Sequence, residues 1–228
     1  DFSNASNWTI SIDGANPAGW EFSSDPSVLP VNGPMNSATS SNGFLFVSSE
    51  ANNTENFDGT PISTTATNVT PINLSGINNV ILRFEHQYRW WQETRGVRVS
   101  GDNGATWTEY LLTLSVEDLL DNGEECINCG GSTYPPDLQS SLTPKIEMIN
   151  ISDVAGGQSQ VLIQFYYNDF DYWGWYWAVD DVSILAQQQY DASLENIIWG
   201  WDNSFDELSL PYFQIPISQL APIDFSSR

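Results

Sequence analysis

Basic residues are scarce in this sequence of 228 residues. Six Lys and Arg stand against 29 Asp and Glu, which gives a net charge of −23. Binding to nucleic acid or to an anionic membrane surface depends on clustered positive charge, so the composition argues against both kinds of ligand. No apolar run approaches the roughly 18 residues that a membrane-spanning helix needs, and we expect no membrane insertion.

Groups for acid–base and nucleophilic catalysis are scarce as well. His86 is the single histidine and Lys145 the single lysine. A Ser–His–Asp or Cys–His triad would have to use His86, and a zinc site built from several histidines is excluded. We therefore expect no enzyme. Paired carboxylates can still hydrolyse glycosides, and Glu85, Glu93 and Asp171 are the first residues to consider for that alternative.

Cysteine occurs twice, as Cys126 and Cys129 in a CxxC pattern. Such a pair can be a redox motif, half of a zinc site or a short disulfide. The sequence has no second CxxC or histidine pair for zinc, and Gly130-Gly131 is a poor start for the helix that a redox motif needs. We expect a disulfide that fixes a loop, and hence an extracellular or cell-surface protein.

Period-two patterns and turn residues dominate the chain, and the one expected helix is short, Val116 to Leu120. Regularly spaced strands between Gly, Pro, Asn and Asp turns are typical of a β-sandwich or jelly roll. The expected strands are Phe44–Ser48, Val80–Trp90, Gly96–Ser100, Thr106–Leu112, Lys145–Ile151, Gln160–Tyr167 and Trp175–Leu185.

Two strands indicate which side chains face the core. In Val80–Trp90 every second residue from Val80 is apolar or aromatic apart from His86, which predicts an inward, hydrogen-bonded histidine rather than a catalyst. In Ala178–Leu185 both faces are largely apolar, so this strand is expected at the centre of a sheet, with Asp180 and Asp181 on opposite faces. A buried carboxylate needs hydrogen-bond donors or a cation.

The segment from Phe165 to Trp177 is dense in aromatic residues. Alternate rings can fill the core, or the loop can form a platform on which sugars stack. Tyr172 and Trp173 stand at the expected loop tip, and Trp91 would extend such a surface. For Trp175 and Trp177 we expect the core.

Arg83 and Arg98 are expected to face outward on paired strands, near Glu85. The arginines would form cross-strand ion pairs or line a groove for an anionic ligand such as an acidic glycan.

Residues Ser100–Trp107 match the SxDxGxTW pattern, which occurs in several copies in sialidase propellers. A single copy predicts a tight β-hairpin with the Trp at its base.

Carboxylates and side-chain amides crowd the expected loops. These hard oxygen donors suit calcium, which takes about six to eight oxygens. No complete EF-hand loop is present, so a calcium site would be assembled from separate segments.

The strand Trp177–Ile184, with its Asp-Asp-Val core, resembles the closing strand of MAM-like jelly-roll domains and of the related cleaved-adhesin domains of secreted Bacteroidetes proteins. Further segments resemble that family in order along residues 1 to about 185. They are Asp1-Phe2-Ser3 as an opening strand, Ala18-Gly19-Trp20, Asn42–Val47, Val80–His86 and Gly96–Ser100.

The resemblance implies a jelly-roll sandwich with structural calcium near the opening strand and the Asp-Asp strand. Asp180 and Asp181 are the implied ligands, with Glu50 and Asp1 as weaker candidates. It also implies a non-catalytic, secreted or cell-surface adhesion module that binds glycan or protein through its loops and outer sheet face.

Residues 186–228 are expected to form a linker and the start of a following Ig-like repeat, which would complete its sheet with the first domain or with a neighbouring protomer. Two other functions stay open, a structural subunit of an extracellular filament and an accessory domain of a secreted hydrolase.

Overall fold

A computed structural model describes residues 2–29, 34–52, 59–90, 93–112, 141, 144–171 and 174–186. The chain divides into two units, Asp1–Gln189 and Tyr190–Arg228, and all described residues belong to the first. Cys126, Cys129, Val116–Leu120 and nearly all of the predicted tail lie outside them, so the predictions made there stay predictions.

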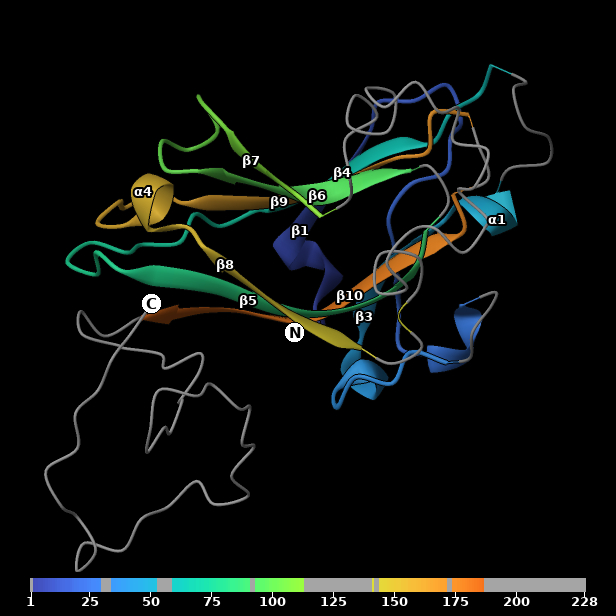
Figure 1. Ribbon diagram of the computed structural model, residues 1–228, viewed down its shortest axis with the longest axis horizontal. Coiled ribbons are helices and arrows are strands. Elements are labelled where there is room, and N and C mark those ends of the chain that lie inside the picture. The colour runs from blue at the N-terminus through green and yellow to red at the C-terminus, as the bar shows by residue number, and fades with distance from the viewer. Residues whose placement is uncertain are drawn as a thin grey trace, which may run out of the picture. The chain divides into compact units, whose positions relative to one another are not determined.

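The described strands form two antiparallel sheets packed face to face, with β5, β8 and β10 in one layer and β6, β7 and β9 in the other (Figure 1). The first sheet has the order β1 (Trp8–Ile12), β4 (Ser63–Asn68), β9 (Leu162–Asn168), β6 (Thr94–Ser100) and β7 (Thr108–Leu111). The second has the order β2 (Glu21–Ser23), β3 (Phe44–Ser48), β10 (Tyr176–Ala186), β5 (Val80–Arg89) and β8 (Lys145–Asn150). The predicted jelly-roll β-sandwich is confirmed.

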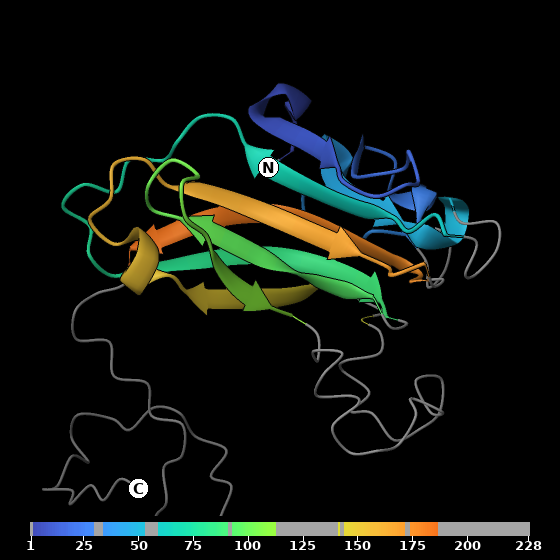
Figure 2. The same cartoon turned by 90° about the horizontal axis from the view of Figure 1, so that it is seen from above.

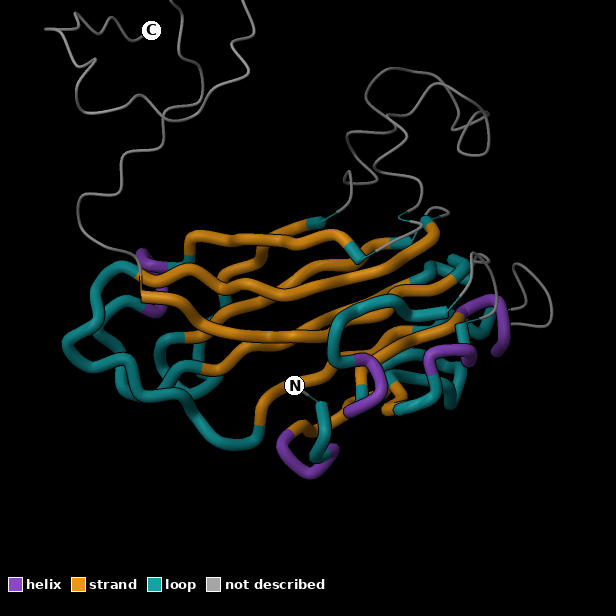
Figure 3. The backbone as a smooth tube through the Cα atoms, turned by 90° about the horizontal axis from the view of Figure 1, so that it is seen from below, coloured by secondary structure: helices purple, strands orange, loops and turns teal. Residues whose placement is uncertain are grey.

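Helices in the described part are short connections outside the sheets (Figure 3). They are α1 (Ser49–Asn52), α4 (Ser152–Ala155) and the 3-10 turns Ala5–Asn7, Pro26–Val28 and Ser40–Asn42. No helix among the described residues is long and apolar enough to span a bilayer.

All seven predicted strands are present with small differences at their ends, and sequence reasoning missed β1, β2 and β4. The sequence of β4 is Ser-Thr-Thr-Ala-Thr-Asn, whose β-branched threonines favour a strand without giving it an apolar face. The predicted opening strand at residues 1–3 is wrong, because β1 begins at Trp8 and Phe2 instead packs into the core from a loop.

Aromatic rings fill the space between the two sheets, whose layers are seen from above in Figure 2. The Phe165 ring lies 5.9 Å from that of Trp177 and 5.3 Å from that of Phe84. The predicted inner face of β5 is confirmed, and His86 is 2% exposed. The Trp177 indole donates to His86 Nδ1 over 3.3 Å, so His86 serves the core, as expected.

Strand β10 changes the side that its alternate residues face. Its pairing with β5 skips a residue between Asp180 and Ser183, a β-bulge at which Asp181 adopts a φ of 52°. Before the bulge Val179 points into the core, and after it Val182 does. The prediction that Asp180 and Asp181 lie on opposite faces is therefore wrong.

The outer face of the second sheet is covered over β3 and the adjoining parts of β10 and β5 by the segment that links β2 to β3, whereas Ile146 and Met148 of β8 stay exposed. A second apolar cluster forms there, made of Leu29, Met35, Phe44, Phe46, Tyr176 and Ala178. Gln87, buried on β5, holds the covering segment by donating to Pro34 O and accepting from Asn36 N, each over 3.3 Å. Trp175 packs against this cluster, and Trp177 belongs to the main core.

Candidate functional site: a polar groove on the first sheet

The outer face of the first sheet carries a row of polar side chains that crosses all five strands. The strand registers place Thr9, Thr67, Gln164, Arg98 and Glu109 side by side, one from each strand. Because alternate residues of a strand share a face, these side chains all point away from the core.

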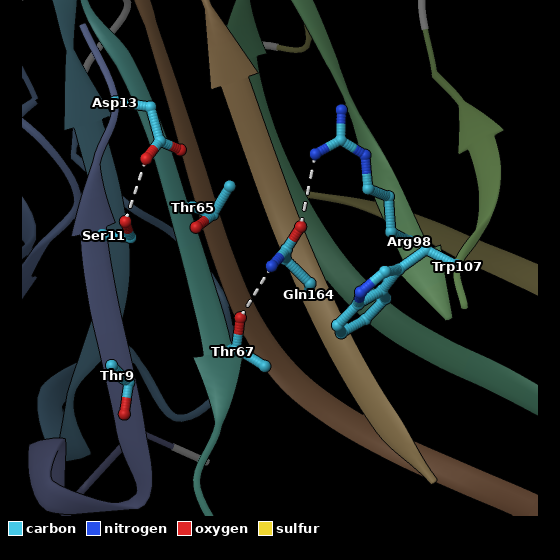
Figure 4. A pocket seen from close by; sticks show the side chains of 8 residues that line it. All are labelled: Thr9, Ser11, Asp13, Thr65, Thr67, Arg98, Trp107 and Gln164. Carbon is cyan, nitrogen blue, oxygen red and sulfur yellow. Dashed lines mark hydrogen bonds between the residues drawn. The ribbon is translucent and has the colours of Figure 1, made fainter. Parts of the chain in front are cut away.

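Hydrogen bonds link four members of this row. Gln164 Nε2 donates to Thr67 Oγ1 over 2.9 Å, and its Oε1 accepts from Arg98 Nη1 over 3.3 Å (Figure 4). Arg98 Nε donates to Glu109 Oε2 over 3.0 Å. This chain of contacts fixes which atom of each side chain donates and which accepts.

Tyr166 supports Arg98 from below. The guanidinium carbon lies 4.3 Å from the centre of the Tyr166 ring. The ring can lie flat because Gly96 has no side chain, and a Cβ there would come within 2.6 Å of Tyr166 Oη. Burial, and next the Glu109 charge, raise the pKa of the Tyr166 phenol, so it stays protonated at neutral pH.

Trp107 borders the groove at the end of the predicted hairpin, which is confirmed. Asp102 fixes the turn by accepting from Thr106 N and Thr106 Oγ1 over 2.8 and 2.7 Å. These bonds lower the pKa of Asp102 to about 2. The turn leaves the Trp107 indole 36% exposed.

The groove has a volume of about 500 Å³. Figure 4 shows the eight residues that line it, Thr9, Ser11, Asp13, Thr65, Thr67, Arg98, Trp107 and Gln164. Four hydroxyls, one amide, one guanidinium and one carboxylate face an open space beside a flat apolar ring. Such a surface can hydrogen-bond to a ligand rich in hydroxyls while the indole covers one of its apolar faces.

Sequence reasoning identified Arg98 among these residues and missed the others. Thr and Ser on alternate positions of a strand are also what any solvated sheet face carries, so their pattern holds no signal of a site. The SxDxGxTW pattern predicts only a structural place for Trp107 in the hairpin, although an indole next to a tight turn is also well placed to stay exposed.

Arg83 and Arg98 do not lie on paired strands, and that prediction is wrong. Arg83 is on β5 of the second sheet, where its Nη2 contacts Glu85 Oε1 over 3.0 Å. Arg98 is on β6 of the first sheet and pairs with Glu109 across strands. Outward alternation is the same in both sheets and does not say which sheet a strand joins. The other predicted ligand-binding residues, Tyr172, Trp173 and Trp91, lie outside the described residues.

The bulge in β10 brings Asp180 and Asp181 together beneath the covering segment. Ser37 Oγ donates to Asp180 Oδ2, and Thr39 Oγ1 lies 3.2 Å from that oxygen and 2.6 Å from Asp181 Oδ1. Asp180 is fully buried, and burial raises the pKa of its carboxyl. Two carboxylates and two hydroxyls at one point are hard oxygen donors of the kind that calcium takes.

Glu50 does not join this group. It lies in α1, which follows β3, and its N–H donates over 3.0 Å to the carbonyl of Trp175, the residue before β10. Asp1 lies outside the described residues, and among those described no three His, Cys, Asp or Glu side chains are grouped to hold a metal. Asp180 and Asp181 fit calcium as part of a ligand set that needs further oxygens.

The three carboxylates considered for glycoside hydrolysis all have structural partners. Glu93 is buried and contacts Arg95 Nη1 over 2.7 Å, while Glu85 pairs with Arg83. Asp171 accepts from the backbone of Gly59 over 2.8 Å. None of the three lines the groove.

No protein-family model matches the sequence, and no curated protein matches it. Among solved structures, the K1 cleaved adhesin domain of Lys-gingipain from Porphyromonas gingivalis W83 is 13% identical. That match covers 80% of this chain and 92% of the other, with a TM-score of 0.45.

Two carbohydrate-binding modules are similar at the same level. TmCBM61, in complex with β-1,4-galactotriose, is 10% identical over 80% of this chain and 90% of its own, with a TM-score of 0.43. The family 11 module from Clostridium thermocellum, in complex with a β-1,3-1,4-mixed-linked tetrasaccharide, is 13% identical over 83% and 95%, with a TM-score of 0.42. The matches carry no conclusion about the function of this chain, and the MAM-like and Bacteroidetes parts of the resemblance stay predictions.

Proposed function

We propose that this chain is a non-catalytic binding module that holds a glycan in the groove of the first sheet. The observation that supports this most is the exposed Trp107 indole beside a row of hydrogen-bonded polar side chains. A sugar ring presents a face of C–H groups to an aromatic ring and a rim of hydroxyls to polar atoms, so it matches both parts of the groove.

The groove is also prepared for binding before a ligand arrives. Gln164 and Arg98 are already held by Thr67, Glu109 and the Tyr166 ring. Side chains that are ordered in the free protein lose less conformational entropy on binding, which favours affinity.

A secreted or cell-surface setting is part of the proposal. It is supported by the acidic composition with a single lysine, and by the CxxC pair expected to form a disulfide. In that setting the module would attach a cell, or a hydrolase that carries it, to a glycan surface. A protein ligand on the same surface is the alternative.

The test is calorimetric titration of the full 228-residue chain with neutral tetrasaccharides of β-1,4-linked glucose, galactose, mannose and xylose. We expect at least one to bind, and Trp107→Ala to weaken that binding about tenfold or more. Met148→Ala is the matched control, since Met148 is 58% exposed on the second sheet and should leave affinity unchanged.

Thermal unfolding of both variants would show that they fold. Binding that is unaffected by Trp107→Ala in a folded protein, or no binding to any of the four sugars and retention of a protein ligand instead, would contradict the proposal.

We further propose that calcium stabilises the domain through Asp180 and Asp181, with oxygens of Ser37 or Thr39 and of further groups completing the set. In support, the buried Asp180 carboxylate lies beside a second carboxylate, and these like charges need a cation or a proton to balance them. Calcium would serve stability here, since the two aspartates belong to the second sheet and the groove to the first.

A further inference from the structure

Arg98 is the only cation among the eight residues that line the groove, and it is held on three sides. Glu109 accepts from its Nε, Gln164 accepts from its Nη1, and the Tyr166 ring lies beneath its guanidinium. The side chains of Arg98 and Glu109 are 37% and 48% exposed, so both charges are within reach of a ligand.

Carboxylates stand on both sides of this arginine. Glu109 lies next to it on the edge strand β7. Asp13, which directly follows the opposite edge strand β1, lines the same groove. The three groups together carry one net negative charge, in a chain whose net charge is −23. An anionic sugar would reach the remaining N–H groups of an Arg98 whose charge Glu109 already neutralises, while both carboxylates and the overall field repel it.

An uncharged sugar meets no such barrier. Its hydroxyls can donate to Asp13 or Glu109 and accept from the N–H groups of Arg98 that remain free of Gln164 and Glu109. The ion pair then stays intact, and no charge has to be stripped of its partner.

We propose that Glu109 is a specificity-determining residue that restricts the groove to uncharged glycans by neutralising the charge of Arg98 and repelling anions. The proposal rests on the glycan-binding function proposed above and adds the class of sugar. The sequence left open whether Arg98 forms an ion pair or lines a groove for an anionic ligand. The proposal selects the ion pair, because the Glu109 carboxylate repels an anionic ligand.

The probes are the four neutral tetrasaccharides and the uronates obtained by oxidising the C6 hydroxyls of the three hexose forms. Each pair shares its linkage and differs in charge. We expect the wild-type chain to bind the neutral member about fivefold or more tightly at low ionic strength, with a smaller difference at about 0.5 M salt.

Glu109→Gln keeps an acceptor for Arg98 Nε and removes the charge. We expect it to strengthen binding of the uronate about fivefold or more and to change binding of the neutral member less than about twofold. Glu21→Gln is the matched control, because Glu21 is exposed on β2 of the second sheet and the variant has the same net charge.

The outcomes separate the two proposals. Preference of the wild type for the uronate, equal binding of both members, or equal effects of Glu109→Gln and Glu21→Gln would overturn the role of Glu109 and leave glycan binding intact. Failure of every neutral and oxidised sugar to bind would overturn both.

Discussion

The two sheets share one core but differ on their outer faces. The first sheet presents an open row of polar side chains that runs from Thr9 to Glu109 across its strands. The second is covered over β3 and the adjoining parts of β10 and β5 by the link between β2 and β3, which adds a small apolar cluster around Met35 and Phe44 and buries Gln87 and Asp180.

This difference separates stability from binding. Polar groups on the open face hydrogen-bond to one another and stay accessible to a ligand. Those on the covered face form hydrogen bonds with the segment above them and are inaccessible. Substitutions on the covered face should therefore lower the free energy of unfolding and leave ligand affinity unchanged. Substitutions on the open face should change ligand affinity and leave the free energy of unfolding unchanged.

The largest effect on this contrast is expected from Met35→Ala. Met35 is 1% exposed in the cluster under the covering segment, and truncating a buried Met typically costs about 2–5 kcal/mol. Chemical denaturation should show that loss, while calorimetry shows unchanged affinity for the sugar that the wild type binds. Lost affinity in the folded variant would mean that the two faces are coupled.

A smaller effect is expected from Asp180→Asn, which tests the calcium proposal. Calcium at about a hundred times its dissociation constant should stabilise the wild type by about 2.7 kcal/mol, seen as a rise in Tm that magnesium does not reproduce. The variant should show little of that rise.

With a chelator present the order of stability should reverse. Burial raises the pKa of Asp180 above its unfolded value, so its contribution to stability is present at low pH and lost as the carboxyl ionises. The uncharged Asn avoids that loss and should be as stable as the wild type or more stable. Equal responses of both proteins to calcium would refute the assignment.

The smallest effect concerns His86, which belongs to the core that both sheets share. Burial, and next the charges of Arg95 and Lys145, hold the pKa of His86 well below its usual value of 6.5, although Glu147 Oε2 lies 3.7 Å from its Nε2. The neutral ring therefore contributes stability above about pH 6.5, which is lost as the pH falls and the unfolded chain takes up the proton.

We expect the free energy of unfolding to fall by up to about 1.4 kcal/mol per pH unit below pH 6.5. His86→Gln should be less stable overall but should lack this dependence between about pH 6.5 and 5.5, where few other groups titrate. Urea unfolding of both proteins at several pH values measures it, and parallel curves would show that His86 is not the group responsible.

The sequence predicted the parts of the fold that depend on alternation within one strand. The apolar positions of β5 from Val80 onward gave its inner face and the place of His86, and the turn residues gave the hairpin before Trp107. Alternation does not determine which strands pair, so Arg83 and Arg98 were placed together although they lie on different sheets.

The groove was beyond sequence reasoning for a related reason. Thr9, Thr67 and Gln164 are far apart along the chain and ordinary on any exposed strand, and they become a site when the registers align them. The bulge at Asp181 was equally hidden, since an extra residue in one strand is visible only against its partner.

That bulge acts as a one-residue frame shift within β10. Upstream of it, odd-numbered residues such as Trp177 and Val179 face the core, and downstream even-numbered ones such as Val182 and Ile184 do. A homologue lacking one residue here would follow a single period-two alternation along the whole strand, with the same residues facing the core. Deleting Asp181 from this chain would therefore remove the bulge and the second carboxylate beside Thr39, and would leave Val182 and Ile184 facing the core.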